Sequence, residues 1–346
     1  YAAALLDFDI RWLWPAPEDT GALCSCPVTV QALSTALEEL AGQGRTPFGV
    51  YLTSPDYYGN LCDIAEIAAV CRRFGIPLLV DNAHGSHLGA FERHPLALGA
   101  SITADSAHKT LPVLTGGAYL HLAHDAPVQD EAAVRGALAL FGSTSPSYLI
   151  LQSLDACNAV LARDYPRRLV QCCVALEGLR RSLNKAAAAR QCPVPLAVAG
   201  AQQEPMKLTL DAAALGCTGT ALADALRRAQ LECEYADPRY VVLMFTPENP
   251  PQDYTRLQAT LEQLLAAVPA GLPRPENRAG EFAALQQQAV QRCTIRQAVL
   301  GAQVRIPVHK ALGRVCAMPT VSCPPAIPVA VSGEEITPAA IVLMQR

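Results

Sequence analysis

The chain has 346 residues, 51% of them hydrophobic, which is enough length for two domains and enough apolar side chains for a core. Its 27 Lys and Arg against 31 Asp and Glu give a net charge of −4, so charge gives no reason to expect binding to nucleic acid or to an anionic membrane. No apolar run reaches the roughly 18 residues that a membrane helix needs.

The cysteines and the N-terminal residues indicate in which cellular compartment the protein is expected. The 13 cysteines are odd in number, lie scattered in apolar segments and never form a Cys-x-x-Cys pair. This pattern favours reduced, packed thiols over a disulfide framework or a zinc site. The first residues carry Asp7 and Asp9 without a basic lead, unlike a signal peptide. We therefore expect a cytoplasmic protein.

The first half of the chain alternates between strand and helix patterns. After a helix end at residues 2–6 and a strand at 10–14, an apolar stripe predicts a helix over 27–40. A strand over 48–53 is followed by an amphipathic helix from residue 64 that Gly75 stops, and then by a strand over 76–80. This βαβ order predicts a parallel sheet.

The pattern changes in the second half. Strands are expected over 96–104 and 117–122, and a long helical region over 148–183, where Pro166 marks a break or a new helix start. The Ala-, Gln- and Pro-rich stretch 186–205 is the best linker candidate. Beyond it the expected order is strand 206–211, helix 221–229, strands 232–235 and 240–246, and helix 253–267.

These elements predict an α/β fold whose mostly parallel sheet is flanked by helices, followed by a smaller C-terminal α+β domain. The predicted boundaries are 1–185 for the large domain and 186–346 for the small one.

Two strand ends carry unusual side chains. Lys109 lies among small and apolar residues in Asp105-Ser-Ala-His-Lys-Thr-Leu-Pro112, and a lysine in such a setting is easier to deprotonate into a nucleophilic amine. Asp81 ends the buried strand Ile76-Pro-Leu-Leu-Val-Asp81. Parallel sheets bind ligands at the carboxyl ends of their strands. An acid there and a Schiff-base lysine nearby are the minimal constellation for pyridoxal phosphate.

Four ordered segments carry a resemblance to a known family. In chain order they are Leu52-Thr-Ser-Pro-Asp-Tyr-Tyr-Gly59, the segment that ends at Asp81 extended through Asn-Ala-His-Gly85, the segment around Lys109, and Gly142-Ser-Thr-Ser-Pro-Ser-Tyr-Leu149. In this order they resemble the Orn/Lys/Arg decarboxylases, a branch of the fold-type I (aspartate aminotransferase-like) pyridoxal phosphate enzymes. The resemblance is strong over about residues 1–185.

The resemblance implies roles for individual residues. Lys109 would form the Schiff base with pyridoxal 5'-phosphate, Asp81 would keep the pyridine nitrogen protonated, and His84 would lie near the reacting carbon. Ser106 and His108 would supply hydrogen bonds towards the phosphate. The Ser143 and Thr144 segment would reach the phosphate of a neighbouring subunit's cofactor, which implies a homodimer or higher homo-oligomer with shared sites.

The same residues could instead have structural roles or bind a metal. Asp81 could cap the turn before Ala83, Ser106 could be a strand-end turn hydroxyl, and Ser143 could belong to a helix N-cap segment. His84 and His87 could serve with Asp81 as metal ligands, although nothing at zinc-type spacing completes such a site. We expect no metal.

The sequence also departs from the family. Relative to this family, we expect that the segment with a phosphate-binding turn and a ring-stacking side chain precedes Tyr1 and is missing from the chain. The family's usual glutamate corresponds to Met318 here. The attachment site's usual downstream glutamine is Gly116. These departures bear on substrate choice and on the activity of the chain alone.

The sequence predicts a pyridoxal phosphate-dependent decarboxylase of the Orn/Lys/Arg type, acting on a small amino acid through a Lys109 Schiff base. Aminotransferase or lyase chemistry remains open, because which bond at Cα breaks depends on pocket geometry. A truncated, non-catalytic relic is the alternative from a different class.

Overall fold

A computed structural model describes residues 2–14, 24–25, 27–200, 202–269, 288–319 and 328–345. The chain divides into two compact units. The larger unit spans Cys26–Pro275, and the smaller one combines Tyr1–Ser25 with Glu276–Arg346. Each unit is described by itself.

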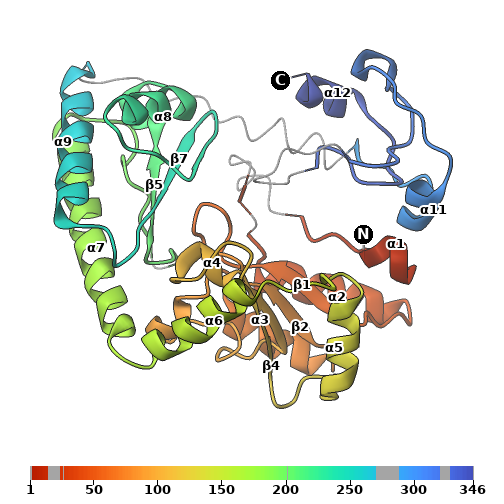
Figure 1. The fold of residues 1–346 in the computed structure, drawn as a ribbon. Helices are drawn as coiled ribbons and strands as arrows, with labels where there is room; N and C mark the ends of the chain where they lie inside the picture. The colour runs from red at the N-terminus through yellow and green to blue at the C-terminus, as the bar shows by residue number, and fades with distance from the viewer. Residues whose placement is uncertain are drawn as a thin grey trace. The chain divides into compact units, whose positions relative to one another are not determined.

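The larger unit contains a four-stranded sheet in the order β1-β2-β3-β4 (Figure 1). Strands β1 (Val50–Thr53), β2 (Leu78–Asp81) and β3 (Ile102–Asp105) run parallel, and β4 (Tyr119–Leu122) pairs antiparallel with β3 at the edge. The predicted mostly parallel sheet is thus confirmed. Strand β3 is shorter than expected, because residues 94–100 form turns before it begins.

Helices α2 (Val30–Gly42) and α3 (Ile64–Arg73) contact each other beside this sheet. The side chains of Thr29 and Asp63 accept the N–H groups of Ala32 and Glu66, so each helix begins at a capping residue. The buried face of α3 is the apolar stripe seen in the sequence: Ile64, Ile67, Ala68, Val70 and Cys71. A short 3-10 helix, η2 (Leu88–Phe91), and the turn helix α4 (Ala107–Thr110) follow β2 and β3.

The predicted long helical region is divided into α6 (Tyr148–Leu161) and α7 (Tyr165–Ala189), preceded by α5 (Glu131–Ala139). Pro166 lies in the first turn of α7, where its missing N–H has no helical partner to lose. One side of α7 is buried in the main core, and it packs alongside α9 (Pro251–Ala267) (Figure 1).

The second sheet of this unit is antiparallel, in the order β5-β7-β6. Its strands are β5 (Lys207–Asp211), β6 (Tyr235–Ala236) and β7 (Tyr240–Met244), joined by η3 (Ala212–Leu215) and α8 (Gly219–Arg228). The predicted strand–helix–strand–strand order is therefore present.

The predicted domain boundary between residues 185 and 186 falls inside α7. In the expected linker, Leu196 and Ala197 are fully buried, and Ala197 bridges Leu210 of β5. The larger unit thus holds both sheets. The division into a cofactor domain and a small domain stays a prediction.

The smaller unit contains α1 (Ala2–Leu6), α11 (Ile295–Leu300), η4 (Val308–Lys310) and α12 (Pro338–Met344). The Arg296 guanidinium donates to the carbonyls of Ala4 and Leu5 at 3.0 Å and joins α11 to α1. The predicted strand over residues 10–14 is wrong: residues 8–14 are irregular. A strand needs a hydrogen-bonded neighbour, and the described pairing in this unit consists of single bridges at other residues.

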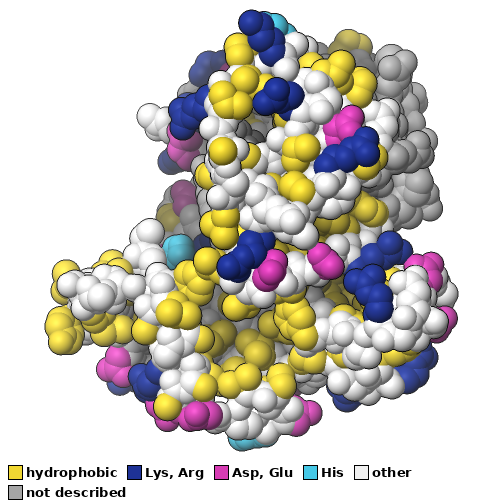
Figure 2. Space-filling view, turned by 90° about the vertical axis from the view of Figure 1, so that its right-hand side faces the viewer, with side chains coloured by type: hydrophobic (Ala, Val, Ile, Leu, Met, Phe, Trp, Pro, Cys, Tyr) yellow, Lys and Arg dark blue, Asp and Glu magenta, His cyan; other side chains and the backbone are white. Residues whose placement is uncertain are grey.

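The surface carries charges of both signs. On the face shown in Figure 2, Lys, Arg, Asp and Glu side chains are interspersed among hydrophobic ones. Among the helices in the described ranges, none combines the length and the apolar character needed to cross a membrane.

Helix α7 offers a matched test of its packing. Leu176 is fully buried, whereas Val174 on the same helix is 64% exposed. We expect Leu176→Ala to lower the free energy of unfolding by about 2–5 kcal/mol, because it leaves a cavity in the core. Val174→Ala should change it by less than about 0.5 kcal/mol. Urea denaturation of both variants measures the difference, and equal effects would contradict this packing.

Candidate active site

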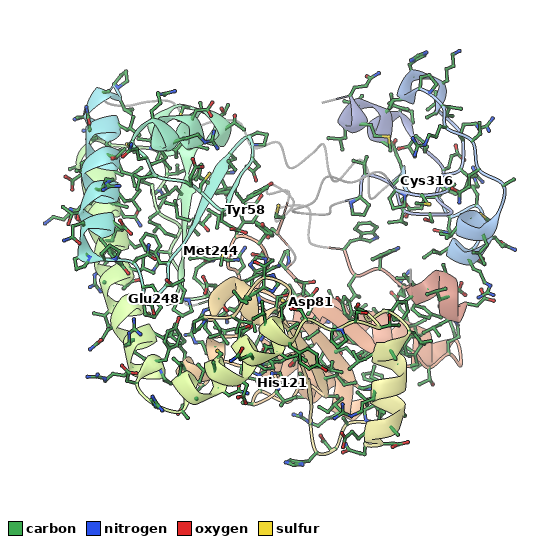
Figure 3. The ribbon with its side chains drawn as sticks, in the orientation of Figure 1. Tyr58, Asp81, His121, Met244, Glu248 and Cys316 are labelled. Atoms are coloured by element: carbon green, nitrogen blue, oxygen red, sulfur yellow. The ribbon has the colours of Figure 1, made fainter. Side chains whose placement is uncertain are left out.

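The carboxyl ends of β1, β2 and β3 meet at one edge of the four-stranded sheet. The register pairs Thr53 with Asp81 and Asp81 with Ala104, so these strands end side by side. Figure 3 shows Asp81 at the edge of the sheet that lies toward Tyr58. The predicted site residues that follow β2 and β3 are therefore gathered at a single edge.

The turn after β2 is tight and internally bonded. The Asp81 carboxylate accepts hydrogen bonds from the Ala83 N–H and from the Tyr51 hydroxyl, both at 3.1 Å. Gly85 leaves no room for a side chain, because a Cβ there would lie 2.0 Å from Asn82 Oδ1. The glycine of the Asp-Asn-Ala-His-Gly segment thus permits the turn that carries His84.

The segment after β3 is a short turn helix. Ser106 occupies the N-cap position of α4, and its carbonyl accepts from the N–H of Lys109 at 3.1 Å. His108 donates from its backbone N–H and from Nδ1 to the carbonyl of Gly117, at 3.2 and 3.0 Å. These bonds fix the direction in which Lys109 leaves the backbone.

Lys109 and His84 meet across this edge. The Lys109 Nζ lies 3.2 Å from the His84 Nε2, although the two residues follow different strands. Burial, together with the nearby charges of Lys207 and Lys109, lowers the pKa of His84 to about 2. The ring is therefore neutral at physiological pH and offers Nε2 as an acceptor to an N–H of Lys109.

A loop after β1 covers His84. The Tyr57 ring packs edge-on against the His84 ring, with 4.8 Å between centroids, and its hydroxyl donates to Glu234 Oε1 at 2.9 Å. The neighbouring Tyr58 is buried and donates to Asp237. The loop therefore joins the first sheet to β6 and the residues around it. Both tyrosines belong to the segment Leu52–Gly59 that carries part of the family resemblance.

Sequence reasoning missed two buried residues from the second sheet region, Glu204 and Lys207. The Glu204 carboxylate bonds His87 Nε2 at 2.7 Å, and Lys207 lies close enough to His84 to lower its pKa. One signal was available, because Lys207 heads an apolar strand, the same kind of setting that singled out Lys109. His87 and His84 thus have separate partners, Glu204 and Lys109.

A second cluster lies beside the site. His94 Nδ1 accepts from the Leu96 N–H at 3.3 Å, so its Nε2 carries the proton and donates to Asp105 Oδ2 at 2.7 Å. Asn82 donates to the same oxygen at 3.0 Å, and His121 Nε2 lies 3.8 Å from it. The ligand atoms of the two histidines and Asp105 lie within 4.8 Å of one another. The hydrogen bonds from His94 and Asn82 hold the Asp105 carboxylate in this cluster.

Ser143 and Thr144 are not brought to the other predicted residues. They lie in the exposed segment between α5 and α6, where the Ser143 hydroxyl accepts from the N–H of Ser145 at 3.0 Å. Their predicted contact was with a neighbouring subunit's cofactor, so that role stays a prediction.

Comparisons with known proteins agree with these features. The family model described as Orn/Lys/Arg decarboxylase, major domain, matches residues 12–202. A Bacillus subtilis protein named YaaO is 32% identical over 308 residues, and the arginine decarboxylase of the same organism is 29% identical over 297 residues. These alignments cover 86% and 84% of this chain.

A solved structure shares the fold. The constitutive lysine decarboxylase of E. coli superimposes with a TM-score of 0.66 at 18% identity, over 90% of this chain and 56% of that chain. The chain spans 61% and 59% of the length of the two Bacillus subtilis relatives.

The neutral state of His84 predicts a pH dependence of stability. Its pKa is about 2 in the folded protein against an ordinary value of 6.5, so between these values only the unfolded chain takes up a proton. Acidification through this window therefore favours unfolding. His84→Asn should make the free energy of unfolding fall less steeply between about pH 6 and pH 4, by up to about 1.4 kcal/mol per pH unit.

Urea denaturation at several pH values gives this slope. The matched control is His124→Asn, because His124 is exposed and should leave the slope unchanged. The same slope in His84→Asn and in the wild type would contradict a buried neutral His84.

Proposed function

The chain belongs to the Orn/Lys/Arg decarboxylase family, whose cofactor is pyridoxal 5'-phosphate, and from this premise we propose that it decarboxylates a small amino acid through a Lys109 Schiff base. The observation that carries the proposal is the 3.2 Å contact between Lys109 Nζ and His84 Nε2, at the same sheet edge as Asp81. A basic amino acid is the proposed substrate class, since relatives are named for arginine and lysine.

The residues at this edge fit the cofactor. A pyridoxal group needs an amine for its aldehyde and an acid for its ring nitrogen, and Lys109 and Asp81 follow adjacent parallel strands. The His84 Nδ1 is buried without a hydrogen-bond partner among the described residues, so the site has an unmet polar group on the ring that faces Lys109. When bound, the cofactor supplies the electron sink that lets the bond to the carboxylate break.

The chain's own side chains then have separate tasks. Asp81, held by the Ala83 N–H and the Tyr51 hydroxyl, keeps a proton on the ring nitrogen. Neutral His84 accepts an N–H of Lys109 and so orients the amine, and the amine can return a proton to Cα. His108 donates its Nδ1–H to the Gly117 carbonyl, which holds the ring in place beside Lys109, and it stays a proposed neighbour of the phosphate. Ser106 contributes its hydroxyl, which makes no capping bond in α4.

We extend the proposal to assembly and compartment. Ser143 and Thr144 lie on an exposed segment, which suits a contact with the phosphate site of a second copy in a homodimer or higher homo-oligomer. The protein is proposed to be cytoplasmic. The family's C-terminal substrate segment corresponds here to the region around Met318, of which residues 320–327 lie outside the described ranges.

The covalent link is tested by spectroscopy. Lys109→Ala should abolish the visible absorption band that appears when pyridoxal phosphate is added to the wild type, because no other amine at this edge occupies the position of Lys109. Lys185→Ala, which removes an exposed lysine of α7, should keep the band. Absence of the band in the wild type would refute cofactor binding by this chain.

The reaction is tested by its products. With arginine, lysine or ornithine, the wild type should release CO2 and the corresponding amine, whereas a keto acid or ammonia would mean transamination or elimination. Asp81→Asn should lower the turnover number by about 10²- to 10³-fold, because a neutral amide does not stabilise a protonated ring nitrogen. If Asp81→Asn matched the wild type, the proposed role of this carboxylate would be wrong.

A further inference from the structure

Lys207 is a second buried lysine at the site. It is the first residue of β5, is 3% exposed, and its Nζ donates to the carbonyls of Asp56 and Tyr57 at 3.2 and 3.0 Å. The same Nζ lies 5.4 Å from the centre of the Tyr57 ring. A buried ammonium is costly unless it is hydrogen-bonded, and these two bonds run to the loop that covers His84.

The surroundings of Lys207 are mixed in charge. Glu204, Asp56 and Glu234 favour its protonated form, whereas burial opposes it most strongly and the charge of Lys109 adds to that effect. The net result is a pKa of Lys207 lowered to about 8, so the ammonium form is the main one at neutral pH.

The backbone of the loop packs closely on this lysine. Gly59 has φ +90°, and a Cβ there would lie 3.2 Å from Glu204 Cγ and 3.4 Å from Lys207 Cδ. The Glu204 N–H donates to the Gly59 carbonyl at 2.7 Å, and the Thr209 hydroxyl donates to the Tyr58 carbonyl at 2.7 Å. The loop is therefore seated on β5 and the residues before it through contacts on both sides of Lys207.

A continuous series of contacts leads from Lys207 to Lys109. Lys207 holds the Tyr57 backbone and faces its ring, the Tyr57 ring packs on His84, and His84 Nε2 contacts Lys109 Nζ. Tyr57 is further held by its hydroxyl on Glu234 and by the Tyr235 ring, at 5.0 Å between centroids.

We propose that Lys207 is a positioning residue of this site: by fixing the Asp56 and Tyr57 carbonyls it holds Tyr57 against His84, and thereby keeps His84 buried, neutral and in contact with Lys109. The inference rests on the proposed function insofar as Lys109 is the reacting amine. Lys207 bonds the Tyr57 carbonyl and faces the Tyr57 ring, and it acts on His84 through that ring in addition to its own charge.

The first test is nitrogen NMR of the histidine rings in the full chain, with the His84 signal assigned from its loss in His84→Asn. In the wild type the His84 ring should stay neutral through the acidic range in which the protein remains folded. Lys207→Met removes the charge and both donated bonds while keeping a side chain of similar length, and should raise the pKa of His84 by about one unit or more. Loss of the Lys207 charge by itself contributes to this rise, so Tyr57→Ala, which keeps the charge and removes the ring, should raise the pKa of His84 as well. The control Lys185→Met, on exposed α7 surface, should leave it unchanged.

A double-mutant cycle separates positioning from a general loss of stability. If Lys207 acts through Tyr57, the losses in kcat caused by Lys207→Met and by Tyr57→Ala will not multiply, and Lys207→Met will have little further effect in the Tyr57→Ala background. KM should change less than kcat, because the geometry of Lys109 and His84 is what is lost. Independent, multiplicative losses would overturn the proposal.

A third measurement does not depend on the folding of Lys207→Met. In Lys109→Met the Lys207 amine remains, and loss of the Lys109 charge should raise its pKa above the wild-type value of about 8, so the His84 ring signals should shift with a midpoint somewhat above 8. Glu204, Asp56, Glu234 and His87 face the same region, and an acid titrating there would give a midpoint well below this. No shift of the His84 signals in this range would overturn the proposed link.

The outcome can be told apart from failure of the proposed function. The NMR titrations need neither cofactor nor substrate, so a wild type without a cofactor band could still show the coupling of Lys207 to His84. A protein that binds the cofactor, but whose His84 signal and kcat are unaffected in Lys207→Met, would refute the positioning role alone.

Discussion

The parallel pairing of β1, β2 and β3 is the constraint on which the site depends. Since parallel strands end at the same edge, Thr53, Asp81 and Ala104 lie side by side, and the side chains that follow them meet. Strand β4 pairs antiparallel with β3, with Tyr119 opposite Asp105, so Gly117 just before β4 lies next to the end of β3, where its carbonyl fixes His108. The separation of the acid from the lysine is thus set by strand spacing rather than by flexible loops.

Around this edge, several buried polar side chains hold one another by hydrogen bonds. The Asp105 carboxylate accepts hydrogen bonds from Asn82 and His94. The bond from Asn82 couples the end of β3 to the segment after β2. Near the second sheet, the Glu204 carboxylate bonds the His87 ring, and the Lys207 ammonium donates to two carbonyls of the loop after β1. Such networks stabilise one arrangement, because removing one member leaves its partner buried without a hydrogen bond.

The two buried lysines illustrate how location separates roles. Lys109 is half-buried on a turn helix at the sheet edge and contacts a neutral imidazole, so its amine is available for chemistry. Lys207 is buried, and its ammonium group donates hydrogen bonds to two main-chain carbonyls, which suits holding a loop rather than reacting. The residue type is the same, and the partners decide what it does.

Periodicity and turn residues in the sequence predicted the order of most elements and the parallel sheet, and the surroundings of Lys109 and the strand end at Asp81 singled out these two residues. His84, Ser106 and His108 are site candidates through the resemblance to the Orn/Lys/Arg decarboxylases. The tertiary structure alone decided that His84 faces Lys109, that Tyr57 covers His84, and that Lys207, far along the chain, holds Tyr57 in place. It also decided that residues 10–14 form no strand and that the boundary at residue 185 lies within a helix. The physical reason is the same throughout: local patterns specify a strand end or a helix face, whereas contacts between distant segments, and the pKa values they produce, exist only once packing has excluded water from between them.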